Sequence, residues 1–199
     1  MPTTGRALHS HFRAVFENAP NQSAKTDSQL ANNFFALDNS AQVLPVNTAP
    51  QTTLHYKNSH FATQLPVHYL YSPSHCWIVS EGENVWRVRF TKFATRMLGE
   101  IVDHGFELEI GSPVTPGKAV GWIEGFKAMS DIFCIADGKF LGGNPLLKER
   151  IELVNKLPYG DGWLYKIEGN PDAFCGDAQS YVKLLDQTIQ RMLEQQKSE

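Results

Sequence analysis

Residues 121–133 read Gly121-Trp122-Ile123-Glu124-Gly125-Phe126-Lys127-Ala128-Met129-Ser130-Asp131-Ile132-Phe133. A single lysine, Lys127, stands between two arms rich in β-forming residues, with the small residues Gly125 and Ala128 close by. Gly117 and Gly138 place turns at nearly equal distances before and after the lysine. We predict a β-hairpin with Lys127 at its tip, where an amine with small neighbours is open to a modifying enzyme. The pattern alone also fits an ordinary surface lysine on a tight turn.

The sequence on both sides of this hairpin continues in short strands separated by Gly/Pro turns. Strands are expected within 67–71, 77–79, 84–90, 101–110, 119–124, 130–135, 139–141 and 163–167. Only small helices interrupt them, one capped by Thr91 and stopped at Gly99, and one in the region 144–155. This rhythm predicts a mainly β fold, a compact barrel or sandwich, rather than alternating βαβ units.

The chain divides into three regions by composition and periodicity. Residues 1–66 are mostly polar, with one candidate helix near 27–37, and we expect a partly helical or disordered N-terminal extension. Residues 67–170 form the expected β domain. Residues 171–199 are expected to hold a C-terminal helix packed on that domain. Its apolar stripe at helical spacing consists of Tyr181, Leu184, Leu185, Thr188, Ile189 and Met192.

Composition excludes several classes of function. The 199 residues carry a net charge of -3 and no concentrated Lys/Arg run, which argues against nucleic acid as a partner. No apolar run is long enough to cross a bilayer, so no membrane partner is expected. The histidines show no metal-ligand spacing.

Cysteine spacing and the N-terminus bear on the compartment. Cys76, Cys134 and Cys175 fit neither a zinc site nor a dense disulfide framework, and they indicate reduced thiols in the cytoplasm, with one bridged pair as the alternative. Arg6 and Arg13, in a start without acids, also fit an organellar presequence, which we weigh below an ordinary short helix.

Five motifs between Tyr71 and Ile167 resemble those of the glycine cleavage H-protein family, in the same order and with nearly the same spacing. The segment from Tyr71 to Ile167, in which they lie, covers about half of the chain. They are Tyr71-Ser72-Pro73-Ser74-His75-Cys76-Trp77, similar to Y-T-x-x-H-E-W; Leu98-Gly99-Glu100-Ile101-Val102, similar to L-G-D-I-V; Glu124-Gly125-Phe126-Lys127-Ala128, similar to the lipoylation motif E-S-V-K-A; Glu152-Leu153-Val154-Asn155, similar to E-L-V-N; and Pro158-Tyr159-Gly160-Asp161-Gly162-Trp163, similar to P-Y-G-E-G-W.

The resemblance implies a flattened β-barrel or barrel-sandwich hybrid of the lipoyl/biotinyl type, with short helices and a C-terminal helix. It implies that Lys127 carries a covalent lipoyl group and that Glu124, Gly125, Phe126 and Ala128 form the attachment motif. The protein would be a non-catalytic carrier of an aminomethyl intermediate and of reducing equivalents. Its partners would be glycine decarboxylase, aminomethyltransferase, dihydrolipoyl dehydrogenase, and a lipoate ligase or lipoyl/octanoyl transferase.

Some residues depart from the family pattern. Cys76 replaces the usual acid before Trp77, and Cys134 stands in a segment that differs from the family's S-P-V-S-G. We expect these departures near surfaces that meet partner enzymes, which leaves the cargo open. His75 matches a family histidine, and we expect it to pack beside Trp77.

Two alternatives therefore stay open. One is an H-like lipoate-binding protein of a heterodisulfide-reductase-like sulfur-oxidation pathway, in which an exposed Cys134 of lowered pKa would assist, although its apolar neighbours favour a buried, inert thiol. The other is an unlipoylated binding module that acts through the N-terminal extension.

Overall fold

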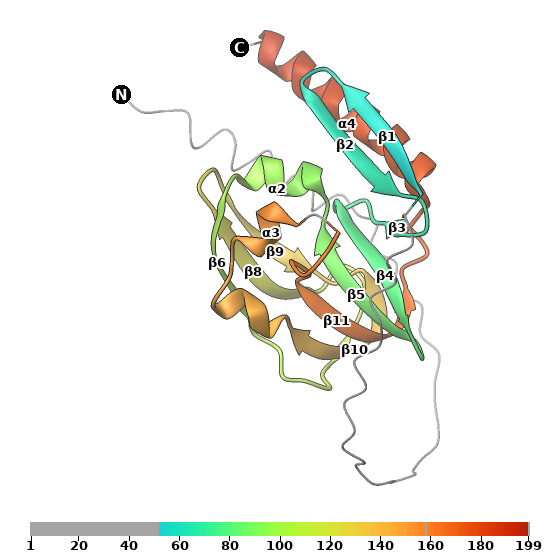
Figure 1. The fold of residues 1–199 in the computed structure, drawn as a ribbon, viewed down its shortest axis with the longest axis vertical. Helices are drawn as coiled ribbons and strands as arrows, with labels where there is room; N and C mark the ends of the chain where they lie inside the picture. Colours follow the sequence, from blue (N-terminus) through green and yellow to red (C-terminus); the bar gives the residue numbers. More distant parts are fainter. Residues whose placement is uncertain (1–51, 158, 199) are drawn as a thin grey trace, which may run out of the picture.

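The computed structural model describes residues 52–157 and 159–198, which form two facing β-sheets, a separate hairpin, short helices and a long C-terminal helix (Figure 1). The larger sheet has six strands, in the order β3 (Leu70–Tyr71), β4 (Cys76–Gly82), β5 (Val85–Phe90), β11 (Tyr165–Pro171), β10 (Ala136–Gly143) and β7 (Pro113–Val114). The smaller sheet has the order β6 (Ile101–Phe106), β8 (Ala119–Gly125) and β9 (Met129–Phe133). The predicted mainly β fold is confirmed.

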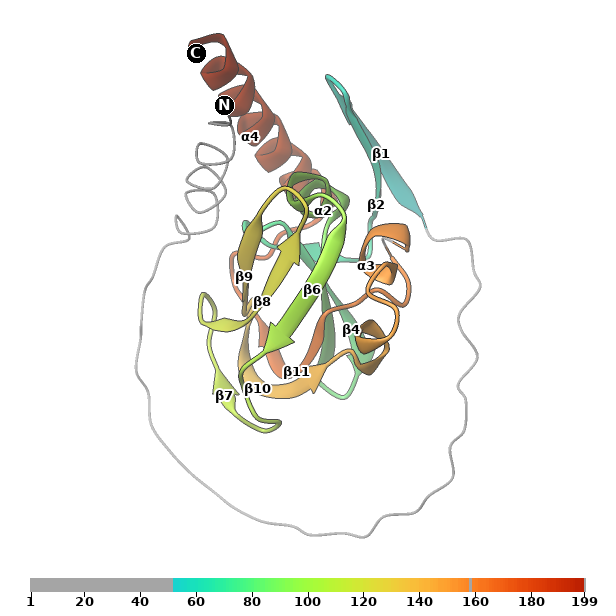
Figure 2. The same cartoon turned by 90° about the vertical axis from the view of Figure 1, so that its left-hand side faces the viewer.

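The two sheets bury their inner faces against each other, as the view in Figure 2 shows. Val88 and Ile167 of the larger sheet and Ile123 and Ile132 of the smaller one belong to one cluster in which each is fully buried. Period-two alternation explains this placement, because every second side chain of a strand reaches the same face. Burying these apolar faces is the main favourable term for the domain.

The helix α2 (Lys92–Leu98) begins and ends where the sequence predicts. The Thr91 side chain accepts a hydrogen bond from the Ala94 amide at 3.4 Å, and the Gly99 N–H donates to the Thr95 carbonyl. Gly99 has φ of +86°, a left-handed conformation that favours glycine. The segment 144–155 forms a short 3-10 helix η1 (Pro145–Lys148) and a single helical turn, α3 (Leu153–Lys156).

In the part of the chain that the structure describes, the first strand begins at Thr53, inside the range 1–66 that we assigned to an N-terminal extension. Strands β1 (Thr53–Asn58) and β2 (Phe61–Pro66) pair as an antiparallel hairpin in register from Thr53↔Pro66 to Asn58↔Phe61. Polar residues between the apolar ones obscured this pattern in the sequence. Tyr56, Phe61 and Leu65 supply the buried face. The candidate helix near 27–37 lies outside the described residues.

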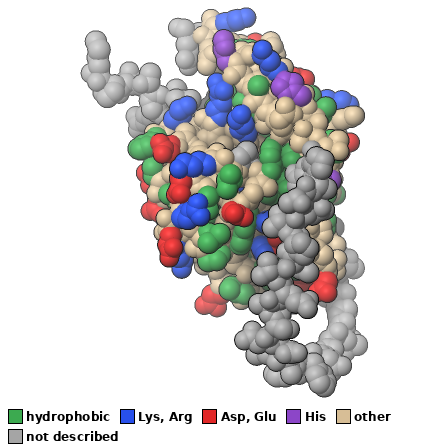
Figure 3. All heavy atoms as spheres, viewed as in Figure 1, with side chains coloured by type: hydrophobic (Ala, Val, Ile, Leu, Met, Phe, Trp, Pro, Cys, Tyr) green, Lys and Arg blue, Asp and Glu red, His purple; other side chains and the backbone are tan. Residues whose placement is uncertain are grey.

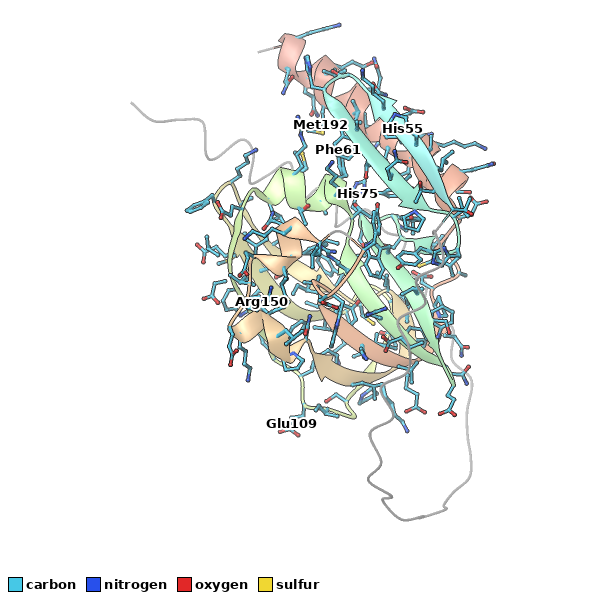
Figure 4. All side chains as sticks on the ribbon, in the orientation of Figure 1. His55, Phe61, His75, Glu109, Arg150 and Met192 are labelled. Atoms are coloured by element: carbon cyan, nitrogen blue, oxygen red, sulfur yellow. The ribbon has the colours of Figure 1, made fainter. Side chains whose placement is uncertain are left out.

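The C-terminal helix α4 (Ala178–Ser198) packs in a second cluster, together with the hairpin and the edge of the larger sheet. Tyr181 and Leu185 of the predicted stripe are buried there, and Tyr71 stacks on Tyr181 with ring centroids 4.9 Å apart. Figure 4 shows Phe61 where the hairpin meets α2, with Met192 of α4 nearby. The hairpin is therefore an integral part of the fold.

None of the helices in the described part of the chain combines the length and the apolar character needed to cross a membrane.

Candidate functional site

Lys127 lies in the tight turn that joins β8 to β9. Glu124 pairs with Met129 at the end of the ladder, and the Gly125 N–H donates to the Ala128 carbonyl at 2.9 Å, closing the turn. Lys127 is exposed in this turn. The structure thus places the lysine where the sequence predicts it, at the bend between two strands of one sheet.

Two backbone hydrogen bonds pin this turn to the segment that follows α2. The Lys127 N–H donates to the Leu98 carbonyl, and the Phe126 N–H donates to the Glu100 carbonyl, each at 2.9 Å. The turn is therefore bonded to the end of α2 and to the residue before β6, so the backbone of Lys127 is fixed while its side chain is exposed. A modified side chain anchored here has a rigid base.

Glycines make this close approach achievable. A Cβ on Gly125 would lie 2.4 Å from the Leu98 carbonyl oxygen, and a Cβ on Gly99 would lie 3.0 Å from Lys127 Cγ. The first contact is with backbone, which cannot move aside without breaking the turn. Gly125, predicted as part of the attachment motif, therefore serves the packing of the turn.

Asn155 of α3 bonds to the segment between α2 and β6, to which the turn at Lys127 is also bonded. Its Nδ2 donates to the Gly99 carbonyl and its Oδ1 accepts from the Ile101 N–H, both at 2.9 Å. The motif Glu152-Leu153-Val154-Asn155 was noted in the sequence only as a resemblance. Its bracing role depends on contacts across more than fifty residues, which no local pattern predicts.

Arg89 holds α3, the short helix that carries Asn155. Its Nη2 donates to the carbonyls of Leu153 and Val154, and the residue is 1% exposed. Burial lowers the pKa of Arg89 to about 10, so the guanidinium keeps its charge at neutral pH. A buried cation that donates to two carbonyls ties α3 firmly to the sheet.

The amine itself meets the end of α2. Lys127 Nζ lies 3.5 Å from the Arg96 carbonyl oxygen, a long contact in an exposed setting. An amide formed on this nitrogen keeps one N–H, so the same acceptor remains usable after acylation. The amine is thus an accessible acyl acceptor.

The remaining motif residues surround the lysine differently. Glu124 is exposed, Phe126 is 76% exposed, and Ala128 is half-buried and packs against the main core. Met129, the next residue, is 49% exposed. The lysine therefore stands beside two exposed apolar side chains, Phe126 and Met129, and the exposed carboxylate of Glu124.

The departures at Cys76 and Cys134 do not lie at a surface, contrary to our expectation. Each residue is 1% exposed, and all three cysteines are free thiols. Burial raises the pKa of the Cys134 thiol to about 11 and that of Cys175 to about 12, and it raises the pKa of Cys76 further. The favoured interpretation of Cys134 as a buried, inert thiol is confirmed.

His75 is a core residue. Its Nδ1 lies 2.9 Å from the Tyr181 hydroxyl, and burial lowers its pKa to about 3. Its ring therefore stays neutral and joins the sheet to α4. Among the described residues, no group of three or more His, Cys, Asp or Glu side chains is arranged to hold a metal ion.

Comparison with known proteins gives a consistent result. The model of the family described as glycine cleavage H-protein matches residues 69–192. The chain is similar to the glycine cleavage system H protein of Corynebacterium jeikeium (strain K411), at 40% identity over 124 residues, covering 60% of this chain and 95% of the relative. It is also similar to that of Sodalis glossinidius (strain morsitans), at 34% identity over 128 residues, covering 63% and 97%.

A solved structure is similar as well. The crystal structure of a glycine cleavage system H protein from Mycobacterium marinum matches with a TM-score of 0.55 and 27% identity, covering 60% of this chain and 97% of that one. The hairpin β1–β2 precedes the residues that the family model matches. The turn at Lys127 and the segments that brace it lie within them.

Proposed function

The chain belongs to the glycine cleavage H-protein family, and on that premise we propose that Lys127 is the residue to which its lipoyl group is attached. The protein is a non-catalytic lipoyl carrier of the glycine cleavage system, with the barrel-sandwich fold of the family and a covalently bound lipoate as its cofactor. The single observation that supports Lys127 is its exposed amine on a turn fixed by backbone hydrogen bonds to Leu98 and Glu100.

The residues around Lys127 suit the group. The amine is exposed. Gly125 lets the turn pack against Leu98, so the backbone stays in place when the side chain enters an enzyme's active site. When bound, the lipoyl group supplies a dithiol–disulfide pair that carries an aminomethyl unit and reducing equivalents. The chain's own part is to hold the attachment nitrogen and to offer the Arg96 carbonyl as its acceptor.

The surrounding motif defines what the attaching enzyme meets. We assign Glu124, Phe126 and Ala128, with Gly125, to recognition of the turn by a lipoate ligase or a lipoyl/octanoyl transferase. Family membership implies partner enzymes such as glycine decarboxylase and aminomethyltransferase. That this chain works with these two and with dihydrolipoyl dehydrogenase is part of the proposal. Tethering makes each transfer local, because the arm stays near the docked enzyme.

The sulfur-oxidation alternative lacks a specific observation in its favour. An exposed Cys134 of lowered pKa would have assisted that chemistry, whereas this thiol is buried and burial raises its pKa. The aminomethyl carrier is therefore the function that we propose.

Mass spectrometry tests the attachment site. Protein produced with lipoate available is analysed intact and by peptide mapping, alongside Lys127→Arg and the control Lys118→Arg, which changes an exposed lysine at the other end of β8. One lipoyl adduct is expected on the peptide that contains Lys127, in the wild type and the control, and none in Lys127→Arg. An adduct on another lysine overturns the assignment.

A further inference from the structure

The hairpin β1–β2 and the helix α2 form a surface without acidic residues beside Lys127. Neither Thr53–Pro66 nor Lys92–Leu98 contains an Asp or a Glu. Lys57 and His60 at the end of the hairpin are exposed, as are Lys92 and Arg96 on the outer face of α2. Figure 3 shows Lys and Arg side chains gathered over this upper part of the molecule. We call these four residues the basic surface.

The hairpin is held in place next to the lysine by Arg96. Arg96 Nη1 donates to the His60 carbonyl at 2.9 Å, and its guanidinium lies 5.8 Å from the centre of the Phe61 ring. The backbone carbonyl of Arg96 is also the acceptor nearest Lys127 Nζ, at 3.5 Å. The same residue thus joins the hairpin to the attachment site.

The far side of the hairpin is fixed as well. The Tyr56 hydroxyl and Asn58 Nδ2 donate to Asp186 of α4 at 2.9 Å and 2.8 Å. The carboxylate of Asp186 therefore accepts hydrogen bonds within the contact between the hairpin and α4. A hairpin tied at both sides presents Lys57 and His60 at fixed positions, so that a partner need not order them on binding.

Exposed apolar side chains also lie near the lysine. Phe126 is 76% exposed, Met129 49% and Val102 41%, and all three lie at the end of the small sheet that carries Lys127. Exposed apolar groups with a charged rim are the usual anatomy of a protein–protein interface. Here the exposed charged side chains of the hairpin and α2 are all basic, whereas the exposed acids Glu100 and Glu124 lie at the turn itself.

The attaching enzyme is the partner that must cover this surface. Enzymes that act on the dithiolane end of the lipoyl arm can bind at a distance from Lys127 equal to the length of the arm. The enzyme that acylates Nζ must bring its active site to the nitrogen itself. Because Nζ lies against the end of α2, that enzyme contacts α2 and the adjacent hairpin. Opposite charges across an interface steer association and fix its orientation.

We propose that the enzyme that attaches the lipoyl group docks on the basic surface through a carboxylate-rich face, with the hairpin β1–β2 as a recognition element that precedes the matched family region. The inference rests on Lys127 as the attachment site. It adds the chemistry of the partner, an acidic protein surface, and the residues of this chain that meet it.

Charge reversal tests this docking. Lys57→Glu/Lys92→Glu alters two exposed lysines that make none of the contacts described above, so the fold stays intact. Lys118→Glu/Lys148→Glu makes the same change in charge away from α2 and the hairpin. Each full-length protein is titrated as the substrate of a purified lipoate ligase from an organism that also produces this protein. Circular dichroism checks that each variant is folded.

We expect the KM of the first variant to rise about tenfold with kcat within twofold of the wild type, because lost rim charges slow association rather than chemistry. The control should keep the wild-type KM, and raising the salt concentration should raise the wild-type KM and narrow the gap. Equal KM values for both variants overturn the docking proposal while lipoylation at Lys127 still stands. Absence of any adduct on Lys127 in the wild type would instead overturn the attachment site.

Discussion

The side chain of Asn155 bonds to the backbone on both sides of Glu100, donating to the Gly99 carbonyl and accepting from the Ile101 N–H at 2.9 Å each. Gly99 lies against Lys127, and its neighbour Leu98 accepts the Lys127 N–H. A carrier that hands its cargo to several enzymes gains from a base that does not shift. Asn155 supplies part of that rigidity from a different part of the chain.

Replacing Asn155 by Ala should loosen this base. Two part-buried hydrogen bonds are lost and their backbone partners are left unpaired, which costs about 1–3 kcal/mol in the free energy of unfolding. Hydrogen exchange should speed up at the Ile101 and Lys127 amides. The control Asn58→Ala, which loses a bond to Asp186, should leave both amides unchanged. Equal protection of Lys127 in wild type and Asn155→Ala would contradict the bracing role.

Replacing Gly125 by Ala should disturb the attachment turn more than its size suggests. The added methyl lies 2.4 Å from the Leu98 carbonyl oxygen, so the turn must move away and weaken the Lys127–Leu98 bond. We expect a loss of about 1–3 kcal/mol in urea unfolding, as for overpacking of a filled site. The lipoylation rate should fall as well. The control is Gly160→Ala, where φ is not in the left-handed region and the added Cβ makes only an ordinary contact with Leu157 at 3.5 Å; it should change neither the stability nor the lipoylation rate appreciably.

Acid should destabilise the protein partly through His75. Its pKa is about 3 in the fold because of burial, against an ordinary 6.5, so the unfolded chain binds the extra proton between these values. Its contribution is complete above pH 6.5 and is lost as pH falls from 6.5 towards 3, by up to about 1.4 kcal/mol per pH unit. Urea unfolding at several pH values measures the slope. His75→Asn, which tolerates the positive φ of 57°, should flatten it; an identical slope would contradict the assignment.

The cysteines should resist labelling in the folded protein. Cys76 and Cys134 are 1% exposed with raised pKa values, so the thiolate that reacts is scarce and covered. Iodoacetamide at pH 8 followed by peptide mapping should find both unmodified in the native state and alkylated in denaturant. Fast alkylation of native Cys134 would return the sulfur-transfer alternative to consideration.

Local chemistry in the sequence determined the lysine hairpin, the strands that flank it, and the limits of α2. Alternation of side chains along a strand and the capping of a helix by Thr91 and Gly99 involve only residues close in the chain, so their pattern can be recognised without the fold. The resemblance of the ordered motifs then pointed to the lipoyl carrier and to Lys127.

Only the tertiary structure decided what surrounds the lysine. The hairpin β1–β2 packs against α4, and Tyr56 bonds to Asp186 130 residues later; Asn155 likewise bonds to Gly99, 56 residues earlier. Cys76 and Cys134 depart from the family pattern, and we expected them near a surface, yet both lie in the core. Such contacts depend on how distant segments pack, and because packing is a property of the whole chain, no short stretch of sequence carries it.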